Sequence, residues 1–287
     1  MKICFIGLGG NSVFLTTDHF HREGETVAAK SFYNEAGGKG YNQAVAAARL
    51  GAECSFIGAF GKDSGAELCV GFLKEEGIKP LPVYKDLPSA YACILTDSQG
   101  ENRVTVYGGA AALLTGEDIK AMEAEIAASD MLVLQNEVAA DVNRVACEIA
   151  EKHGVKILIN PAPAIGMDVS LLKKAFVITP NLHEATMLFG EHWMSGMEKE
   201  GIKYAVVTCG SKGVVVYNKG IITPIKALPV KVVDTTGAGD CFTAALAVKL
   251  CEGEGLYNAA VFANKAASVA VSRPYAVAAM PKMEEII

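Results

Sequence analysis

Asp234-Thr-Thr-Gly-Ala-Gly-Asp240 runs directly into the apolar stretch Cys241-Phe-Thr-Ala-Ala-Leu-Ala-Val248. Two glycines around an alanine allow a tight turn and let the backbone approach a ligand closely. We expect a helix to begin near Gly239 or Asp240, and the first N–H groups of a helix find no partner within it. Because such a helix end attracts anions, this turn predicts a site for phosphate groups.

Asp240 adds a carboxylate to this electropositive place. Asp is also a common N-cap residue, but a cap requires neither the glycine turn nor the second acid, Asp234, at the head of the motif. A carboxylate beside a phosphate site is suited to take a proton from an attacking hydroxyl group. The motif therefore predicts a phosphoryl-transfer enzyme.

The composition is that of an ordinary globular protein, with 51% hydrophobic and 20% charged residues. The 287 residues suit one α/β domain, which we place at 1–287. The net charge of −6 and the scattered Lys and Arg residues argue against nucleic acid as a partner. The eight cysteines include no Cys-x-x-Cys pair and indicate a reduced, cytoplasmic protein rather than a zinc site. Since no run of about 18 apolar residues occurs, we expect no membrane span.

Short apolar runs alternate along the chain with longer, alanine-rich segments. We expect buried strands at 2–6, 55–58, 131–134, 156–160, 177–179, 205–208 and 214–217. We expect helices at 41–50, 65–76, 115–127, 141–153, 184–189, 240–251 and 257–271. Strands that alternate with helices favour a mainly parallel sheet covered by helices on both faces.

Residues of about 12–36 and 83–108 break this rhythm, because extended alternation of polar and apolar residues replaces the long helices. Within the second stretch, 90–96 and 103–107 flank a polar turn and predict a β-hairpin. We interpret the two stretches as a small sheet outside the core, a candidate lid. Its exposed face is alternatively a dimer contact, since a small sheet needs something to cover it.

Two further glycine-rich stretches follow strands in the first half of the chain. Gly37-Gly-Lys-Gly40 lacks the spacing of a P-loop, but Lys39 and Asn42 lie three residues apart at a helix start, where both can reach one polar ligand. A tight turn is the alternative. Gly7-Leu-Gly9 resembles a dinucleotide-binding fingerprint, yet position 12 is Ser and no acid closes a second strand about 20 residues later, which argues against a dehydrogenase.

In the second half, polar residues again follow two predicted strands. Asn181 and Glu184 lie three apart at a helix start, which is also a capping signature. Another strand ends in Val207–Gly213, which contains small and hydroxyl residues. These residues could pack against the edge of a nucleotide, or they could form only a turn between two strands. Together these residues occupy the carboxyl ends of successive strands, where open α/β sheets bind ligands.

Taken in order, these stretches resemble the ribokinase-like (PfkB) carbohydrate kinase family, with ribokinases as its nearest members. The resemblance covers nearly the whole chain. It rests on Gly37–Gln43, Phe56–Asp63, Asn160-Pro-Ala-Pro-Ala164, Thr179–Asn181 with Glu184, Thr208–Gly213 and, most specifically, Asp234–Asp240. It implies a three-layer α/β/α core with a mainly parallel central sheet, plus a small β-sheet lid that often forms a homodimer contact. It also implies ATP-dependent phosphorylation, with Mg²⁺, of a hydroxymethyl group on a small sugar.

The resemblance further implies a role for each matching residue. The general base would be Asp240, and the anion hole would be the backbone N–H groups of Gly237, Ala238 and Gly239. Sugar hydroxyls would be held by Gly38, Lys39, Asn42 and Glu137. The nucleotide would be lined by Thr208, Gly210, Ser211, Gly213 and Asn264, with Asn181 and Glu184 near Mg²⁺ and the phosphates. A potassium site would use Asp234 and Thr236 together with carbonyl groups of Ala270, Arg273 and Tyr275.

The chain departs from this family pattern at two places. Gly10 and Ser12 stand where ribokinases carry an Asn and an Asp that grip the sugar, and in the potassium loop Tyr275 and Ala279 replace a usual Gly and Ser. The acceptor therefore stays open: ribose or a related pentose comes first, and a ketohexose is the alternative. A nucleoside kinase and a non-catalytic sugar sensor are the other hypotheses, and the intact Asp240 with its glycine turn argues against the sensor.

Overall fold

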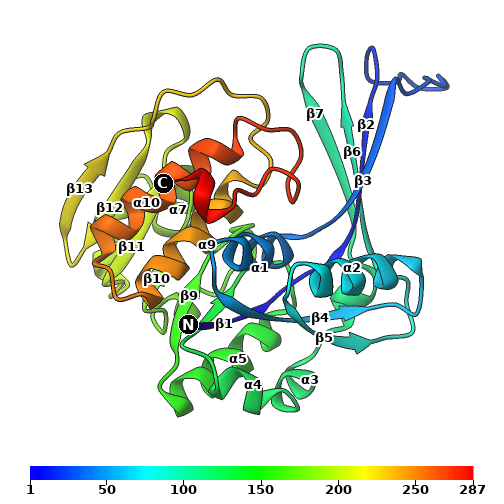
Figure 1. The fold of residues 1–287 in the computed structure, drawn as a ribbon. Coiled ribbons are helices and arrows are strands. Elements are labelled where there is room, and N and C mark those ends of the chain that lie inside the picture. Colours follow the sequence, from blue (N-terminus) through cyan, green and yellow to red (C-terminus); the bar gives the residue numbers. More distant parts are fainter. Residues whose placement is uncertain (287) are drawn as a thin grey trace.

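The computed structural model describes residues 1–286 and contains two β-sheets of unequal size (Figure 1). The larger sheet has nine strands in the order β13-β12-β11-β10-β9-β8-β1-β4-β5. Its strands are β1 (Lys2–Ile6), β4 (Glu53–Phe60), β5 (Lys79–Tyr84), β8 (Met131–Leu134), β9 (Lys156–Ile159), β10 (Val177–Ile178), β11 (Tyr204–Thr208), β12 (Val214–Asn218) and β13 (Ile221–Ile225). All pairs from β5 to β11 are parallel, whereas β12 and β13 pair antiparallel at one edge. The parallel strands therefore end along one edge of the sheet.

Both faces of the central strands are buried. In β1, Ile3 and Phe5 belong to one core cluster, whereas Cys4 and Ile6 belong to the other. Successive side chains of a strand point to opposite faces, so a strand buried on both sides consists of apolar residues throughout. This is why the strands of the larger sheet are visible in the sequence as short, continuous apolar runs.

Helices cover each face and complete a three-layer α/β/α core. One layer contains α1 (Lys39–Arg49), α2 (Ser64–Glu75), α9 (Ala238–Cys251) and α10 (Leu256–Ala270). The other contains α3 (Gly116–Lys120), α4 (Glu123–Ala127), α5 (Ala140–His153), α6 (Val169–Leu172), α7 (Leu182–Phe189) and α8 (Trp193–Lys199). Short 3₁₀ turns occur at Gly109–Leu113, Gly210–Lys212 and Met283–Glu285. In residues 1–286, no helix combines the length and apolar character needed to cross a bilayer.

The smaller sheet stands out from the core in Figure 1. Its order is β3-β2-β6-β7, with β2 (Gly10–Thr16), β3 (Ser31–Gly37), β6 (Ala90–Thr96) and β7 (Asn102–Tyr107). Strand β2 pairs parallel with β6 and antiparallel with β3, while β6 and β7 form the antiparallel hairpin that the sequence predicts. Only residues 7–9 separate β1 from β2, so the smaller sheet begins where the central strand ends.

The smaller sheet is tied to the loop that follows α10. Glu35 of β3 is buried, and its carboxylate accepts hydrogen bonds from the backbone N–H groups of Ala276 (2.9 Å), Val277 (3.3 Å) and Ala278 (3.0 Å). Burial raises the pKa of Glu35, and these N–H donors oppose the rise. Beside it, the ring of Tyr275 stacks on that of Tyr33 with 3.8 Å between ring centroids. These contacts fix the base of the smaller sheet against the core.

Some predicted boundaries are wrong. Residues 79–84 form β5 of the larger sheet, so the small sheet's second segment begins at Ala90 rather than at 83. Pro80 and Pro82 argue against a strand, yet β5 lies at a sheet edge, where proline is tolerated. The helix predicted at 115–127 is interrupted between α3 and α4, because the backbone of Met122 (φ −104°, ψ 13°) leaves the helical region.

Candidate active site

Polar residues follow the parallel strands at their carboxyl ends. Gln135 and Glu137 follow β8, Asn160 follows β9, and Thr179 follows β10. The amino-terminal ends of α1 and α9 meet them there, because side chains of α1 bond both to Asn160 and to Asp240 of α9. The site therefore lies at the edge of the sheet where the sequence predicts ligand binding.

Asp240 lies in the first turn of α9 and is 6% exposed. The N-cap of this helix is Gly237 rather than Asp240, so the capping interpretation of Asp240 is wrong. Its carboxylate accepts hydrogen bonds from Asn42 Nδ2 (to Oδ2, 2.9 Å) and from Gln43 Nε2 (to Oδ1, 2.9 Å). Burial raises the pKa of Asp240, while the neighbouring Lys39 and these two amide donors oppose the rise.

In the glycine turn before Asp240, one glycine is closely packed against other residues, whereas the other has free space beside it. Gly237 adopts a left-handed conformation (φ 74°), and a Cβ atom added there would lie 3.1 Å from Met280 Cε and 3.3 Å from Ala276 Cα. A Cβ atom added at Gly239 would meet nothing within 4 Å, so space adjoins this residue. The N–H group of Ala238 donates to Thr235 O (3.2 Å). Within residues 1–286, the backbone N–H groups of Gly237, Gly239 and Asp240 have no backbone acceptor, which makes them available donors at this helix start.

Lys39 and Glu137 flank the same carboxylate. The backbone N–H group of Lys39 donates to Glu137 Oε2 (2.7 Å). The Asp240 carboxylate is the main reason why the pKa of Lys39 is raised, so its ammonium group remains charged. Burial raises the pKa of Glu137 to about 7, although Lys39 opposes the rise. The Lys39 ammonium group thus interacts electrostatically with two acids, the buried Asp240 and the half-buried Glu137.

The sugar-side residues suggested by the resemblance line the junction of the two sheets. A Cβ atom at Gly38 (φ 118°) would lie 2.2 Å from Leu8 O, and one at Gly10 would lie 2.4 Å from Ala90 O, so both positions exclude a side chain. The point where a Cβ atom of Gly37 would stand is 2.6 Å from Ser12 Oγ and 3.8 Å from Asn42 Oδ1. Ser12 and Asn42 therefore face the same place.

The residues that the resemblance suggests for binding the nucleotide and its phosphates form a continuous strip. Asn181 and Glu184 make a reciprocal capping box at the start of α7, with 2.8 Å for each hydrogen bond, so the capping interpretation is confirmed for this pair. A β-bridge joins Asn181 to Thr208 at the end of β11. Gly210 and Ser211 are exposed in the 3₁₀ turn that follows. A Cβ atom added at Gly213 (φ 94°) would lie 2.1 Å from Ile225 O, so this position excludes a side chain. Asn264 Nδ2 donates to Lys226 O (2.9 Å), which places it at the far end of the strip.

The residues suggested for a potassium site also lie together, although the carboxylate between them is engaged. Asp234 Oδ1 accepts from the N–H and hydroxyl groups of Thr236 (2.9 and 2.7 Å), and Oδ2 accepts from the N–H group of Tyr275 (3.0 Å). Tyr275 has φ 70°, a conformation that favours glycine. The guanidinium group of Arg273 pairs with Glu285, and Ala270 ends α10. In the described chain, no three His, Cys, Asp or Glu side chains are grouped to hold a metal ion.

Several functional candidates were not predicted from the sequence. Gln43, Gln135 and Asn160 are buried polar residues beneath Asp240, joined to one another by hydrogen bonds. The available signal was weak: Gln43 follows Asn42 and Asn160 begins the Asn-Pro-Ala-Pro stretch, but neither residue type indicates burial by itself.

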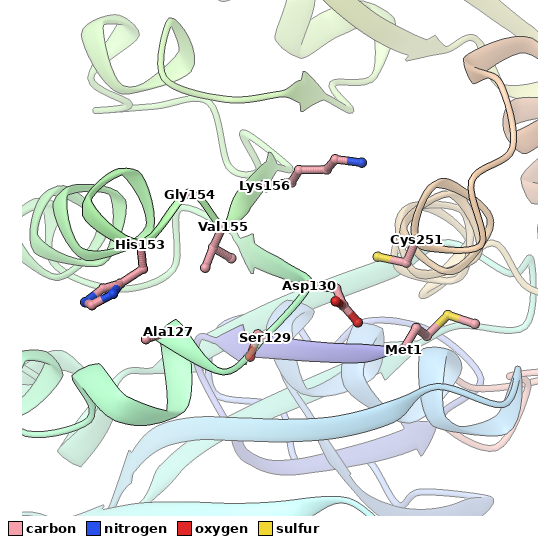
Figure 2. Close-up of a pocket in the computed structure, with 9 residues that line it drawn as sticks. All are labelled: Met1, Ala127, Ser129, Asp130, His153, Gly154, Val155, Lys156 and Cys251. Atoms are coloured by element: carbon pink, nitrogen blue, oxygen red, sulfur yellow. The ribbon is translucent and has the colours of Figure 1, made fainter.

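The cavity drawn in Figure 2, of about 510 Å³, is separate from this site. Met1, Asp130 and Lys156 line it at the amino-terminal ends of the strands, the opposite edge of the sheet from Asp240. In Figure 2 the side chains of His153 and Lys156 point away from each other. The cavity therefore does not contribute to the site around Asp240.

Residues 1–283, nearly the whole chain, match the model of the pfkB family carbohydrate kinases. The chain belongs to this family. This pfkB kinase is 36% identical over 300 residues to ribokinase of Bacillus subtilis, covering 99% of this chain and 98% of that protein. It is 34% identical over 284 residues to ribokinase of Haemophilus influenzae, covering 95% of this chain and 93% of that one. The family and the enzyme class predicted from the sequence are confirmed: the pfkB kinase is an ATP-dependent carbohydrate kinase.

Solved structures of similar proteins confirm the predicted fold class. The crystal structure of ribokinase from Thermotoga maritima superposes with a TM-score of 0.91 at 33% identity, covering 100% of the pfkB kinase and 98% of that chain. Ribokinase of Arabidopsis thaliana, solved in complex with ribose and ATP, gives a TM-score of 0.86 at 28% identity, with 99% and 96% covered. The mainly parallel sheet and the smaller sheet are thus features of this fold.

Proposed function

We propose that this kinase transfers the γ-phosphate of ATP to a hydroxymethyl group of ribose or a related pentose. The observation that carries the proposal is one helix end: the first turn of α9 combines the buried Asp240 carboxylate with the open backbone at Gly239. A base and an anion-binding turn are the two elements that phosphoryl transfer to an alcohol requires. Ribose comes first because ribokinases of several organisms are more than 30% identical over nearly the whole chain.

In the proposed reaction, Asp240 accepts the proton of the attacking hydroxyl group. The N–H groups of Gly237 and Gly239 donate to the oxygens of the phosphoryl group, and the N–H group of Ala238 joins them if it leaves Thr235 O. Lys39, which stays charged beside Asp240, adds positive charge where negative charge develops. Such preorganised donors act strongly because the surrounding protein keeps water out.

The side-chain oxygen of Asn42 supports the proposal of sugar binding, because it is an acceptor without a donor. Its Oδ1 atom is buried and has no hydrogen-bond partner in the described structure, although Nδ2 is bound to Asp240. A buried acceptor without a donor costs free energy, and a sugar hydroxyl group would supply that donor. Glu137 and Ser12 add further acceptors on either side. Because the neighbouring carbonyl of Ala90 dictates Gly10, the missing side chain opens no space there, which favours a small sugar over a nucleoside.

Asn181 and Glu184 fit a role near Mg²⁺, since carboxylate and amide oxygens are ligands that this ion prefers. The capping box uses Glu184 Oε2 and keeps both side chains fixed at the carboxyl end of the sheet. When bound, Mg²⁺ would neutralise phosphate charge. For K⁺, the residues present fit through the backbone: Asp234 binds the Tyr275 N–H group, and Tyr275 retains the left-handed turn that glycine adopts more easily.

We further propose that the smaller sheet acts as a lid and as the contact of a homodimer. Val104 and Val106 lie on one face of β7 and are 54% and 60% exposed. Apolar side chains on a small sheet need a cover, and a second copy of the sheet would supply one. A cytoplasmic location remains our expectation, and the eight free cysteines of the chain agree with it.

The test is ADP release from Mg-ATP with a panel of pentoses, ketohexoses and nucleosides, with and without K⁺. We expect strong turnover with ribose and a loss of about 10²- to 10⁴-fold in kcat for Asp240→Asn, with nucleotide binding retained. Asp168→Asn is the matched control, because it removes the charge of an exposed carboxylate at the cap of α6. Unchanged turnover in Asp240→Asn would overturn the proposed base. Absence of turnover with every acceptor would favour the sugar sensor.

A further inference from the structure

Gln43 lies directly behind Asp240 and is completely buried. It follows Asn42 on α1, and the two amides approach different oxygens of the same carboxylate: Gln43 donates to Oδ1 and Asn42 to Oδ2, both at 2.9 Å. The Asn42 side carries the free acceptor of the sugar site, whereas Gln43 faces the protein interior. The two carboxylate oxygens therefore have different surroundings.

A chain of hydrogen bonds fixes which end of the Gln43 amide faces Asp240. Gln135 Nε2 donates to Gln43 Oε1 (2.6 Å), so the oxygen end of Gln43 points toward Gln135. Asn160 Nδ2 donates to Thr179 O (2.7 Å), which turns Asn160 Oδ1 toward Gln43 Nε2 (3.2 Å). Gln43 Oε1 accepts from Gln135, and Asn160 Oδ1 offers an acceptor to Gln43 Nε2. Because of these two contacts, the NH₂ group of Gln43 is the end of the amide that faces Asp240.

Two glycines allow the backbone to pack closely against the side chain of Gln135. A Cβ atom added at Gly7 or at Gly40 would lie 2.5 Å from Gln135 Oε1 in either case, and 3.0 Å from the Cα atom of the other glycine. The end of β1 and the start of α1 thus close around the Gln135 side chain, which is itself fully buried. Close packing against Gln135 therefore explains why residue 7 is a glycine. This is the first glycine of the stretch that resembles a dinucleotide-binding fingerprint.

We propose that Gln43, oriented by Gln135 and Asn160, is a positioning residue that holds Oδ1 of Asp240 so that Oδ2 faces the sugar hydroxyl group. The proposal rests on the proposed function, because it assumes that Asp240 is the base. Gln43 touches neither substrate; it acts through the carboxylate that it holds. The charged groups that face Asp240 from the surrounding elements are Lys39 of α1, Glu137 after β8 and Glu184 of α7. None of them fixes the rotation of the carboxylate as a hydrogen bond from a rigid amide does.

The test is a double-mutant cycle between Gln43→Leu and Asp240→Asn, measured with ribose and Mg-ATP. Gln43→Leu keeps the size of the side chain and removes the donor. We expect kcat to fall by about 10- to 100-fold, the effect of a misplaced reacting group, while KM for both substrates changes by less than about threefold. In the Asp240→Asn background, the same substitution should not lower the residual rate further, because a residue that acts through Asp240 has nothing left to hold.

Tyr41→Phe is the matched control. Tyr41 lies on the same helix with the same burial, and its hydroxyl group donates to Cys69 O (2.8 Å) on the side away from Asp240. It should lose stability with kcat unchanged. If Gln43→Leu does not fold, Gln135→Leu tests the same chain of amides one step away and should lower kcat with KM retained.

The outcomes separate this inference from the proposed function. A large loss for Asp240→Asn with no effect of Gln43→Leu, or an equal fold-loss for Gln43→Leu in both backgrounds, overturns the positioning role and leaves the base intact. Full activity in Asp240→Asn overturns the base itself and the inference with it.

Discussion

Glu137 is a carboxyl group of the site with a pKa near neutrality, because burial raises its pKa to about 7. Below this pH the group becomes protonated and loses the negative charge with which, in the proposed function, it would bind sugar hydroxyl groups. We therefore expect KM for the sugar to rise as the pH falls from about 8 to about 6, by up to about tenfold per pH unit below the pKa. Initial rates at several pH values measure this change.

Glu137→Gln supplies the comparison, since it keeps the shape and removes the titration. Its KM for the sugar should be raised at pH 8 and nearly constant across the range. A variant whose KM still follows pH as the wild type does would show that another group titrates.

At the residue scale, the sequence predicted the candidates whose motif is compact and missed those defined by distant contacts. Asp240 and the glycine turn could be identified because seven consecutive residues carry the pattern. Gln43 and Gln135 could not, because 92 residues separate them and their side chains meet only in the folded chain. Glutamine is usually exposed, so a sequence gives no reason to place either one beneath a carboxylate.

At the scale of elements, Glu35 makes the most testable link between β3 and the loop after α10. Glu35→Ala would leave the N–H groups of Ala276, Val277 and Ala278 without their acceptor. Ala276 and Val277 are buried, and unpaired buried donors cost about 1–3 kcal/mol each. We expect the free energy of unfolding to fall by about 2–4 kcal/mol in total, since the loop relaxes. Urea denaturation measures the loss, and faster hydrogen exchange at residues 276–278 locates it.

Asn34→Ala is the control, because Asn34 is the exposed neighbour on the same strand. Its effect should stay within about 0.5 kcal/mol. Equal stability of both variants would contradict the structural role of Glu35.

The elements themselves were predictable to different degrees. The parallel strands are apolar on both faces, so a simple run of residues reveals them. Strand β5 was not predicted, because Pro80 and Pro82 are penalised in a strand interior and tolerated at an edge. The edge position is a property of the assembled sheet. The interruption at Met122 depends on one backbone conformation, which hydrophobic periodicity does not register.

At the scale of the whole molecule, the proposed homodimer predicts that light scattering gives twice the mass of one chain. Val106→Asp should convert the protein to the mass of one chain, because burying a carboxylate in an apolar contact is costly. Thr105→Asp tests the opposite face of the same strand and should leave the mass unchanged. A wild-type protein with the mass of one chain would contradict the dimer.

The hydrogen bond between Asn42 and Asp240 joins residues 198 positions apart. During synthesis on the ribosome, α1 and the first strands emerge long before α9 exists. The site residues of α1 are therefore synthesised early, and they meet the Asp240 carboxylate only after most of the chain has been translated. A nascent chain that stops before α9 carries the proposed sugar-binding residues without the proposed base, so we expect catalytic competence only near the end of translation.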